Sequence, residues 1–165
     1  HKGVPVIALI GGRAGAFGGG GLVTACCSHI VISEQGRISV SGPEVIETNK
    51  GVEEFDSKDR ALVWRVTGGR SRVLLGGADS YVKGDITSFR KAAAHVRNSV
   101  PTLSLETLEH EQERLEQRLS AFGDRRDTPE IWTRIGLPNP AGIADLTEDE
   151  FIHLLAKEGV RHDAR

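Results

Sequence analysis

The densest run of glycine in this chain comes early: seven glycines fall within residues 11–21. Glycine loses more backbone freedom on folding than any other residue, so such a run indicates positive φ angles or a close approach of the backbone. Before it, residues 4–10 are continuously apolar and rich in β-branched side chains, which is typical of a parallel strand covered on both faces. Small and apolar residues up to His29 favour a short helix, and residues 30–33 favour another strand. This order of strand, glycine loop, helix and strand predicts an α/β domain.

Three further signals extend this unit. Gly42-Pro43-Glu44 predicts the start of a helix, with proline in its first turn. Residues 56–67 predict a helix that ends at the glycine pair 68–69. Asp85 predicts an N-cap, because apolar residues follow it at helical spacing. We expect residues 1–100 to form an α/β core, and the chain to hold only a part of a domain.

The composition changes after Pro101. Residues 104–122 predict a long and largely solvated helix with one narrow stripe of leucines, at Leu105, Leu108, Leu115 and Leu119. Residues 136–142 predict an irregular connection. The last helix has the spacing of a capping box with a hydrophobic staple, at Leu146, Thr147, Glu150 and Phe151. We expect residues 101–165 to form a helical extension that packs on the core or on a partner.

Composition excludes several classes of function. Lys and Arg number 21 against 23 Asp and Glu, and no basic window is interleaved with aromatic residues, which argues against nucleic acid as a partner. No apolar run approaches the twenty or so residues of a membrane span, so we expect a cytoplasmic protein. The adjacent Cys26 and Cys27 lack the spacing of a zinc or redox site and are interpreted as small core residues. No metal site can be assembled from the spacing of the histidines. The chain contains no methionine, and we expect it to be a fragment of a longer protein.

The glycine run itself predicts a site for negative charge. Backbone N–H groups at a helix N-terminus are free to donate, and the helix dipole favours an anion there. A P-loop would require Lys and then Ser or Thr after the last glycine, but Leu22 and Val23 follow it. A dinucleotide site matches the glycine spacing poorly, and its acidic residue would have to be Glu34, in a turn. An oxyanion hole for a thioester carbonyl is the third possibility, and pattern alone does not choose among them.

Two motifs carry a resemblance to a known family. Residues 11–19 read Gly-Gly-Arg-Ala-Gly-Ala-Phe-Gly-Gly, and residues 41–47 read Ser-Gly-Pro-Glu-Val-Ile-Glu. Together with residues 51–60, Gly-Val-Glu-Glu-Phe-Asp-Ser-Lys-Asp-Arg, they resemble the beta subunit of biotin-independent malonate decarboxylase. The Gly-Pro-x-Val-Ile-Glu element also resembles the beta-type carboxyltransferase subunit of acetyl-CoA carboxylase. The resemblance is close over residues 4–92.

The resemblance implies an α/β fold of the crotonase/ClpP type, a spiral of β-β-α units, here in its C-terminal part. It implies a malonyl thioester on the phosphopantetheine-type group of an acyl carrier protein as substrate, with no cofactor bound by this chain itself. Loss of CO2 leaves an enolate, which protonation converts to the acetyl thioester. A gamma subunit of related fold is the partner that the resemblance implies.

The resemblance also suggests which residues form the site. The backbone N–H groups of Gly18 and Gly19 are expected to hold the enolate oxygen. Arg13, Gly20 and the Gly42-Pro43-Glu44 segment are expected to contact substrate. Each has a structural explanation too: glycines permit tight packing, acidic residues are favoured in a first helical turn, and Arg13 can form an ordinary salt bridge.

Two other functions fit the same motifs. One is carboxyl transfer in a biotin-dependent acyl-CoA carboxylase, which has the same glycine features. The other is a noncatalytic assembly module, in which the leucine stripe of residues 104–122 docks on a partner. The acidic residues 53–56 fit either a partner contact or a solvated face.

Overall fold

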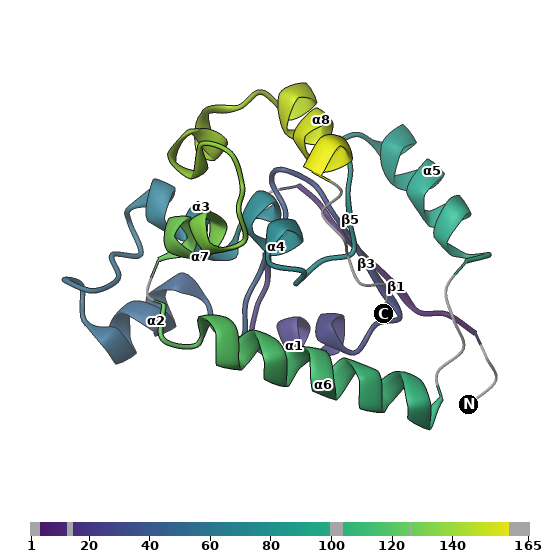
Figure 1. Ribbon diagram of the computed structural model, residues 1–165, viewed down its shortest axis with the longest axis horizontal. Helices are drawn as coiled ribbons and strands as arrows, with labels where there is room; N and C mark the ends of the chain where they lie inside the picture. The colour runs from purple at the N-terminus through teal and green to yellow at the C-terminus, as the bar shows by residue number, and fades with distance from the viewer. Residues whose placement is uncertain (1–3, 13–14, 100–103, 126, 159–165) are drawn as a thin grey trace.

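The computed structural model describes residues 4–12, 15–99, 104–125 and 127–158. Its centre is a three-stranded parallel sheet in the order β1 (Ile7–Ile10), β3 (His29–Ile32) and β5 (Ser80–Tyr81). Ile7 pairs with His29 and Val31 with Ser80, so the three strands run side by side (Figure 1). Residues 30–32 of the middle strand are at most 1% exposed. The two strands predicted around the glycine run are confirmed, although β1 begins later than residue 4. The prediction that this first strand is covered on both faces was wrong, because Leu9 in β1 is 48% exposed.

A second parallel pair lies beside this sheet. β2 (Gly15–Ala16) pairs with β4 (Arg37–Ile38), with Gly15 opposite Arg37. β2 interrupts the glycine run, which the sequence predicted as one continuous loop. A strand of two residues has too little side-chain pattern to be found before its partner strand is known.

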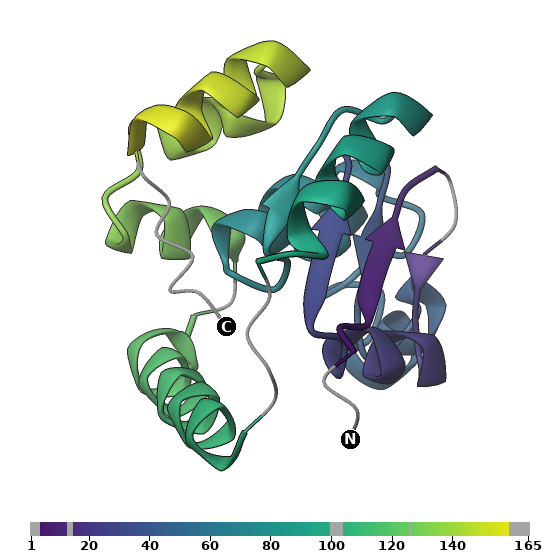
Figure 2. The same cartoon turned by 90° about the vertical axis from the view of Figure 1, so that its right-hand side faces the viewer.

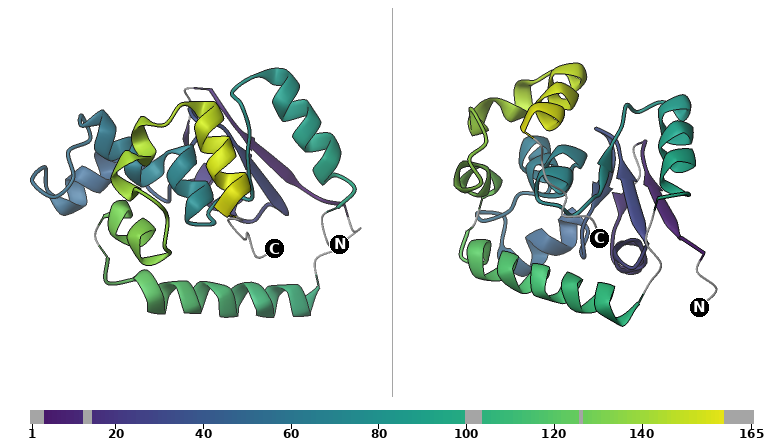
Figure 3. Two further views of the ribbon diagram at one scale, coloured as in Figure 1. Left: turned by 45° about the horizontal axis from the view of Figure 1, so that its top comes forward. Right: turned by 45° about the vertical axis from the view of Figure 1, so that its right-hand side comes forward.

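Five helices accompany the sheets: α1 (Gly19–Ala25), α2 (Pro43–Lys50), α3 (Arg60–Thr67), α4 (Gly69–Leu74) and α5 (Ile86–Val96). α5 packs on β1 and β3 from one side, and α4 packs beside β5 (Figures 1 and 3). The predicted N-cap of α5 is confirmed, because the Asp85 carboxylate accepts a hydrogen bond of 2.8 Å from the Ser88 N–H. The predicted start of α2 at proline is also confirmed.

The prediction of one helix over residues 56–67 was wrong in its start and incomplete at its end. The residues before Arg60 form turns, and Asp59 caps α3 by accepting a hydrogen bond from the Leu62 N–H. Gly68 ends α3 as predicted but also begins α4. A Cβ on Gly69 would lie 2.2 Å from the Ser33 carbonyl oxygen, so glycine lets α4 start against the middle strand.

The C-terminal part is helical, as predicted, with α6 (Leu105–Phe122), α7 (Thr128–Arg134), a 3-10 helix (Pro140–Asp145) and α8 (Glu148–Glu158). α7 was not predicted, and the 3-10 helix takes over part of the connection predicted as irregular. The buried side chains of these helices form one apolar cluster with α4, which contains Val73, Leu74, Trp132, Leu137, Ile143 and Phe151. Figure 2 shows α7 and α8 stacked on the side of the sheet that α4 occupies.

α6 differs from the other helices. None of its residues is buried, and its four stripe leucines are 48–71% exposed. It crosses the width of the molecule along one side (Figure 1). The Arg118 guanidinium donates to the Leu75 carbonyl oxygen and so joins the helix to the end of α4. Within the described residues, no helix is long and apolar enough to cross a membrane.

The capping box of α8 is confirmed. The Thr147 N–H and hydroxyl both donate to the Glu150 carboxylate at 2.7 Å, and these bonds lower the pKa of Glu150. Phe151 is fully buried and Leu146 packs against the same cluster, as a hydrophobic staple requires.

Candidate functional site

The fold brings the glycine run and the Gly-Pro-Glu segment together. The Gly18 N–H donates to the Val40 carbonyl oxygen at 2.9 Å, and the Ser39 N–H donates to the Ala16 carbonyl oxygen at 3.1 Å. A Cβ on Gly21 would lie 2.3 Å from the Ser39 carbonyl oxygen, so only glycine allows this approach. Two segments separated by about twenty residues therefore form one continuous backbone surface.

The backbone donors of the glycine run are not equivalent. The Gly18 N–H is used by Val40, and the Gly20 N–H donates to the Phe17 carbonyl oxygen at 3.1 Å. Gly18 is the N-cap of α1 and has a φ of 57°, which favours glycine. Among the described residues, no group accepts a hydrogen bond from the Gly19 N–H, and a Cβ on Gly19 would meet nothing within 4 Å. Of the two expected oxyanion donors, Gly19 is thus the one whose N–H has no acceptor among the described residues.

A cavity of about 500 Å³ opens between β4, α2 and α3. Its walls carry Gln35, Arg37, Pro43, Glu44, Ser57, Arg60, Val63 and Trp64. Pro43 and Glu44 were expected from the sequence to contact substrate, and both line this cavity; Pro43 is buried and Glu44 exposed. The other six residues were not predicted. A sequence signal existed only for Ser57 and Arg60, which lie in the segment that carries part of the resemblance.

Arg37 connects the cavity to the glycine run. Its guanidinium carbon lies 5.5 Å from the ring centroid of Phe17 and 5.4 Å from that of Trp64. Both distances are within the range of cation–π attraction. Phe17 belongs to the glycine run and Trp64 to α3, so this arginine contacts both sides of the site.

The Ser57 wall of the cavity is held by Glu47 on α2. The Ser57 N–H donates to the Glu47 carboxylate at 2.8 Å. This backbone bond, a side-chain bond from Ser57 and the charge of Lys58 lower the pKa of Glu47. Glu47 is therefore a charged structural anchor for the loop between α2 and α3.

The remaining expected residues are placed as follows. Arg13 lies outside the described residues. Gly18, Gly19 and Gly20 are exposed at the start of α1, and Gly42 is the half-buried N-cap of α2. The interpretation of Cys26 as a core residue was wrong, because α1 ends just before it and leaves it exposed. Cys27 is half-buried and packs against the apolar cluster that contains Ile30 and Ile32.

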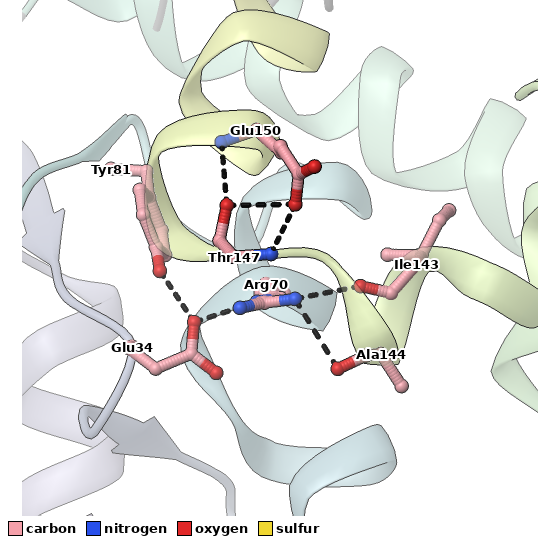
Figure 4. Close-up of polar contacts among 7 residues, drawn as sticks. All are labelled: Glu34, Arg70, Tyr81, Ile143, Ala144, Thr147 and Glu150. Carbon is pink, nitrogen blue, oxygen red and sulfur yellow. Dashed lines mark hydrogen bonds and ion pairs between the residues drawn. The ribbon is translucent and has the colours of Figure 1, made fainter.

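A second polar cluster lies apart from this cavity (Figure 4). The Glu34 carboxylate accepts hydrogen bonds from the Arg70 Nε–H at 2.6 Å and from the Tyr81 hydroxyl at 2.5 Å. Arg70 also donates to the Ile143 carbonyl oxygen at 2.7 Å and stacks on the Phe151 ring. Burial and the bond to Glu34 raise the pKa of Tyr81, so it stays protonated. The hydrogen-bonding groups of the cluster are paired with one another, so the cluster connects the sheet to the C-terminal helices.

In the described part of the chain, no three His, Cys, Asp or Glu side chains lie together as a possible set of metal ligands. The donors that the site offers include backbone N–H groups and two arginines, Arg37 and Arg60. Such donors stabilise negative charge on a carbonyl oxygen, a carboxylate or a phosphate.

No family model matches the chain. Over 156 residues it is 38% identical to the malonyl-S-ACP:biotin-protein carboxyltransferase MADC of Malonomonas rubra, which covers 90% of this chain and 49% of that protein. A chain of the Pseudomonas malonate decarboxylase hetero-tetramer in complex with malonate has a TM-score of 0.63 and 33% identity, over 73% of this chain and 42% of its own. A chain of the Pseudomonas MdcD-MdcE hetero-dimer has a TM-score of 0.53 and 28% identity, over 68% and 46%.

This chain spans about half the length of the curated relative that it matches. The helix-rich α/β fold with small parallel sheets agrees with a partial domain of these proteins. The relationship predicted from the two motifs is confirmed: this chain is a homologue of part of the subunits of malonate decarboxylase and of the malonyl-S-ACP carboxyltransferase.

Proposed function

We propose that this chain is part of a beta-type subunit of malonate decarboxylase. The reaction converts the malonyl thioester of an acyl carrier protein to the acetyl thioester and CO2. The malonyl-S-ACP substrate is supported by the 38% identity, over 90% of the chain, to a protein named for its action on malonyl-S-ACP. The loss of CO2 is supported by the likeness to a chain of Pseudomonas malonate decarboxylase, with a TM-score of 0.63, which is the observation that carries the proposal. The likeness to chains of Pseudomonas malonate decarboxylase supports the same substrate class.

The chemistry requires a place for the electrons that the departing CO2 leaves behind. Those electrons form an enolate, whose oxygen is the former thioester carbonyl oxygen. A backbone N–H directed at that oxygen stabilises the charge as it develops, and removal of one such donor changes a rate by about 10²–10³. We assign this role to Gly19, because its N–H lacks an acceptor among the described residues.

The proposal includes the rest of the assembly. We expect the spiral of β-β-α units to be complete only in a longer chain, with residues 1–100 as core and 101–165 as helical extension. A gamma subunit of related fold and an acyl carrier protein are the proposed partners, and the hetero-dimer and hetero-tetramer of the Pseudomonas relatives support a mixed assembly. The phosphopantetheine-type group would enter with the carrier protein.

Carboxyl transfer to biotin is a second candidate, favoured by the name of the curated relative. In this reaction the same carbon–carbon bond breaks and the same enolate forms, but the carboxyl group moves to a biotin nitrogen instead of leaving as CO2. The glycine run serves both reactions equally. The two candidates therefore differ in the acceptor and share the cleavage step.

The test is turnover of the purified complex. The full-length protein is co-expressed with its candidate gamma partner and supplied with malonyl-S-carrier protein, without biotin. Release of CO2 together with acetyl-S-carrier, followed by mass spectrometry, is the expected result. Release only after a biotinylated carrier protein is added would move the assignment to carboxyl transfer, and no cleavage under either condition would overturn both.

A further inference from the structure

The cavity beside the glycine run carries more positive charge than the proposed oxyanion donor requires. Two arginines, Arg37 and Arg60, and one glutamate, Glu44, are the charged residues that line it. Arg60 is the first residue of α3 and Glu44 lies in the first turn of α2. The formal charge of the walls is therefore positive.

Arg60 has no ion pair within the described chain. The carboxylates nearest to it in sequence are engaged elsewhere. Asp59 accepts from the Leu62 N–H at 3.1 Å, and Asp56 accepts from the Lys58 N–H at 2.8 Å. Glu47 across the loop is bonded to the Ser57 N–H. The positive charge of Arg60 is thus left for a ligand or for solvent.

Arg37 differs from Arg60 in being fixed. The rings of Phe17 and Trp64 hold its guanidinium group, so little side-chain entropy remains to be lost on binding. Trp64, Pro43 and Val63 give the same cavity an apolar wall. Fixed positive charge beside an apolar wall suits a ligand with an anionic head on a largely apolar arm.

We propose that this cavity is a binding subsite for an oxyanion, a carboxylate or a phosphate, that Arg37 and Arg60 hold beside the glycine run. The identity of this anion rests on the proposed function, whereas the binding of an anion does not. One origin is the carboxylate of the malonyl group, and the other is the phosphate of the carrier protein's prosthetic arm.

Calorimetric titration of the purified full-length protein, in its complex, measures this binding without turnover. Malonate and inorganic phosphate are the two probes. Tighter binding of malonate identifies the subsite as one for the carboxylate, and tighter binding of phosphate identifies it as one for the prosthetic arm. Absence of binding by both probes overturns the proposal.

Arg60→Gln removes the charge and keeps most of the side-chain volume. We expect the affinity for the preferred probe to fall about tenfold or more, because a charge-assisted hydrogen bond is lost. Arg97→Gln, at the exposed C-terminal end of α5, is the matched control and is expected to leave the affinity unchanged. Equal affinities of the Arg60→Gln variant and the unmodified protein, or equal losses in both variants, contradict the subsite.

Trp64 gives an independent readout. It lines the cavity, whereas the other tryptophan, Trp132, is buried in the cluster of the C-terminal helices. We expect the probe to change tryptophan fluorescence and Trp64→Phe, which keeps a ring against Arg37, to remove that change while calorimetric binding persists. An unchanged fluorescence response in Trp64→Phe places the probe elsewhere. Because no step needs catalysis, a complex that binds the probes but releases no CO2 would contradict the proposed function alone.

Discussion

The α/β region of residues 4–99 and the helical region of residues 104–158 are held together in different ways. In the first, backbone meets backbone: Gly21 lies against Ser39, Gly69 lies against Ser33, and the Gly18 N–H bonds to Val40. In the second, side chains make the contacts, through one apolar cluster and the guanidinium of Arg70. Close backbone contacts hold backbone N–H groups in position, where they can bind a substrate. Side-chain contacts attach the C-terminal helices to the α/β region. The candidate site therefore lies in the first region, and part of its stability comes from the second.

The strongest test of this contrast is Phe151→Ala. The Phe151 side chain belongs to the apolar cluster and is 0% exposed to solvent. Its truncation is expected to lower the free energy of unfolding by about 3–5 kcal/mol. Chemical denaturation followed by circular dichroism measures the loss. His153→Ala, exposed on the same helix, serves as control, and a loss below about 1 kcal/mol in Phe151→Ala would contradict the account.

Arg70→Ala tests the polar contacts that connect the two regions. It removes the bond to Glu34, the bond to the Ile143 carbonyl oxygen and the contact with the Phe151 ring. We expect a loss of about 2 kcal/mol, reduced because Glu34 is partly solvated. Denaturation of Arg90→Ala, on the exposed face of α5, gives the control. Equal stability of the two variants would show that the apolar cluster alone holds the helices.

Within the α/β region, the loop between α2 and α3 should respond to acid. The pKa of Glu47 is lowered from 4.5, chiefly by the Ser57 N–H, so the charged form stabilises the fold. This contribution is present above pH 4.5 and is lost as the pH falls through the lowered pKa. The stability difference between the unmodified protein and Glu47→Gln should therefore shrink below pH 4.5. A difference that is constant across this pH range would rule out the anchoring role of Glu47.

The smallest effect on stability is expected in α6. Leu108→Ala and Leu115→Ala should each change the free energy of unfolding by no more than about 0.5 kcal/mol, because both side chains are about half exposed. The same variants address the assembly function considered from the sequence. If they abolish complex formation while the unfolding energy stays constant, the leucine stripe is a docking surface. Normal assembly by both variants would exclude that role.

What the sequence could predict was local. The cap of α5 at Asp85, the proline start of α2 and the capping box at Thr147 each depend on residues within four positions of one another. The glycine run and the Gly-Pro-Glu segment could be recognised as motifs, and the adjacency of the two emerges only when β2 pairs with β4.

The contacts that could not be predicted join distant residues. Arg37 lies between Phe17 and Trp64, and Arg70 reaches Glu34 and Ile143, 36 and 73 positions away. No periodicity marks such contacts, because each depends on a single side chain after the chain has folded. The break between α3 and α4 was missed for a related reason: two adjacent glycines indicate the end of a helix, and the contact of Gly69 with Ser33 that starts the next one is tertiary.

The most direct test of the central claim is the activity of Gly19→Val in the assembled complex. A Cβ at this position meets nothing within 4 Å, so the change alters the surroundings of the N–H without a clash in the protein. Ala25→Val, exposed at the end of the same helix, controls for helix stability. With malonyl-S-carrier protein as substrate, kcat/KM is predicted to fall about 10²-fold or more in Gly19→Val and to remain unchanged in Ala25→Val. A correctly assembled Gly19→Val complex with full activity would contradict the claim that the glycine run stabilises the reacting thioester.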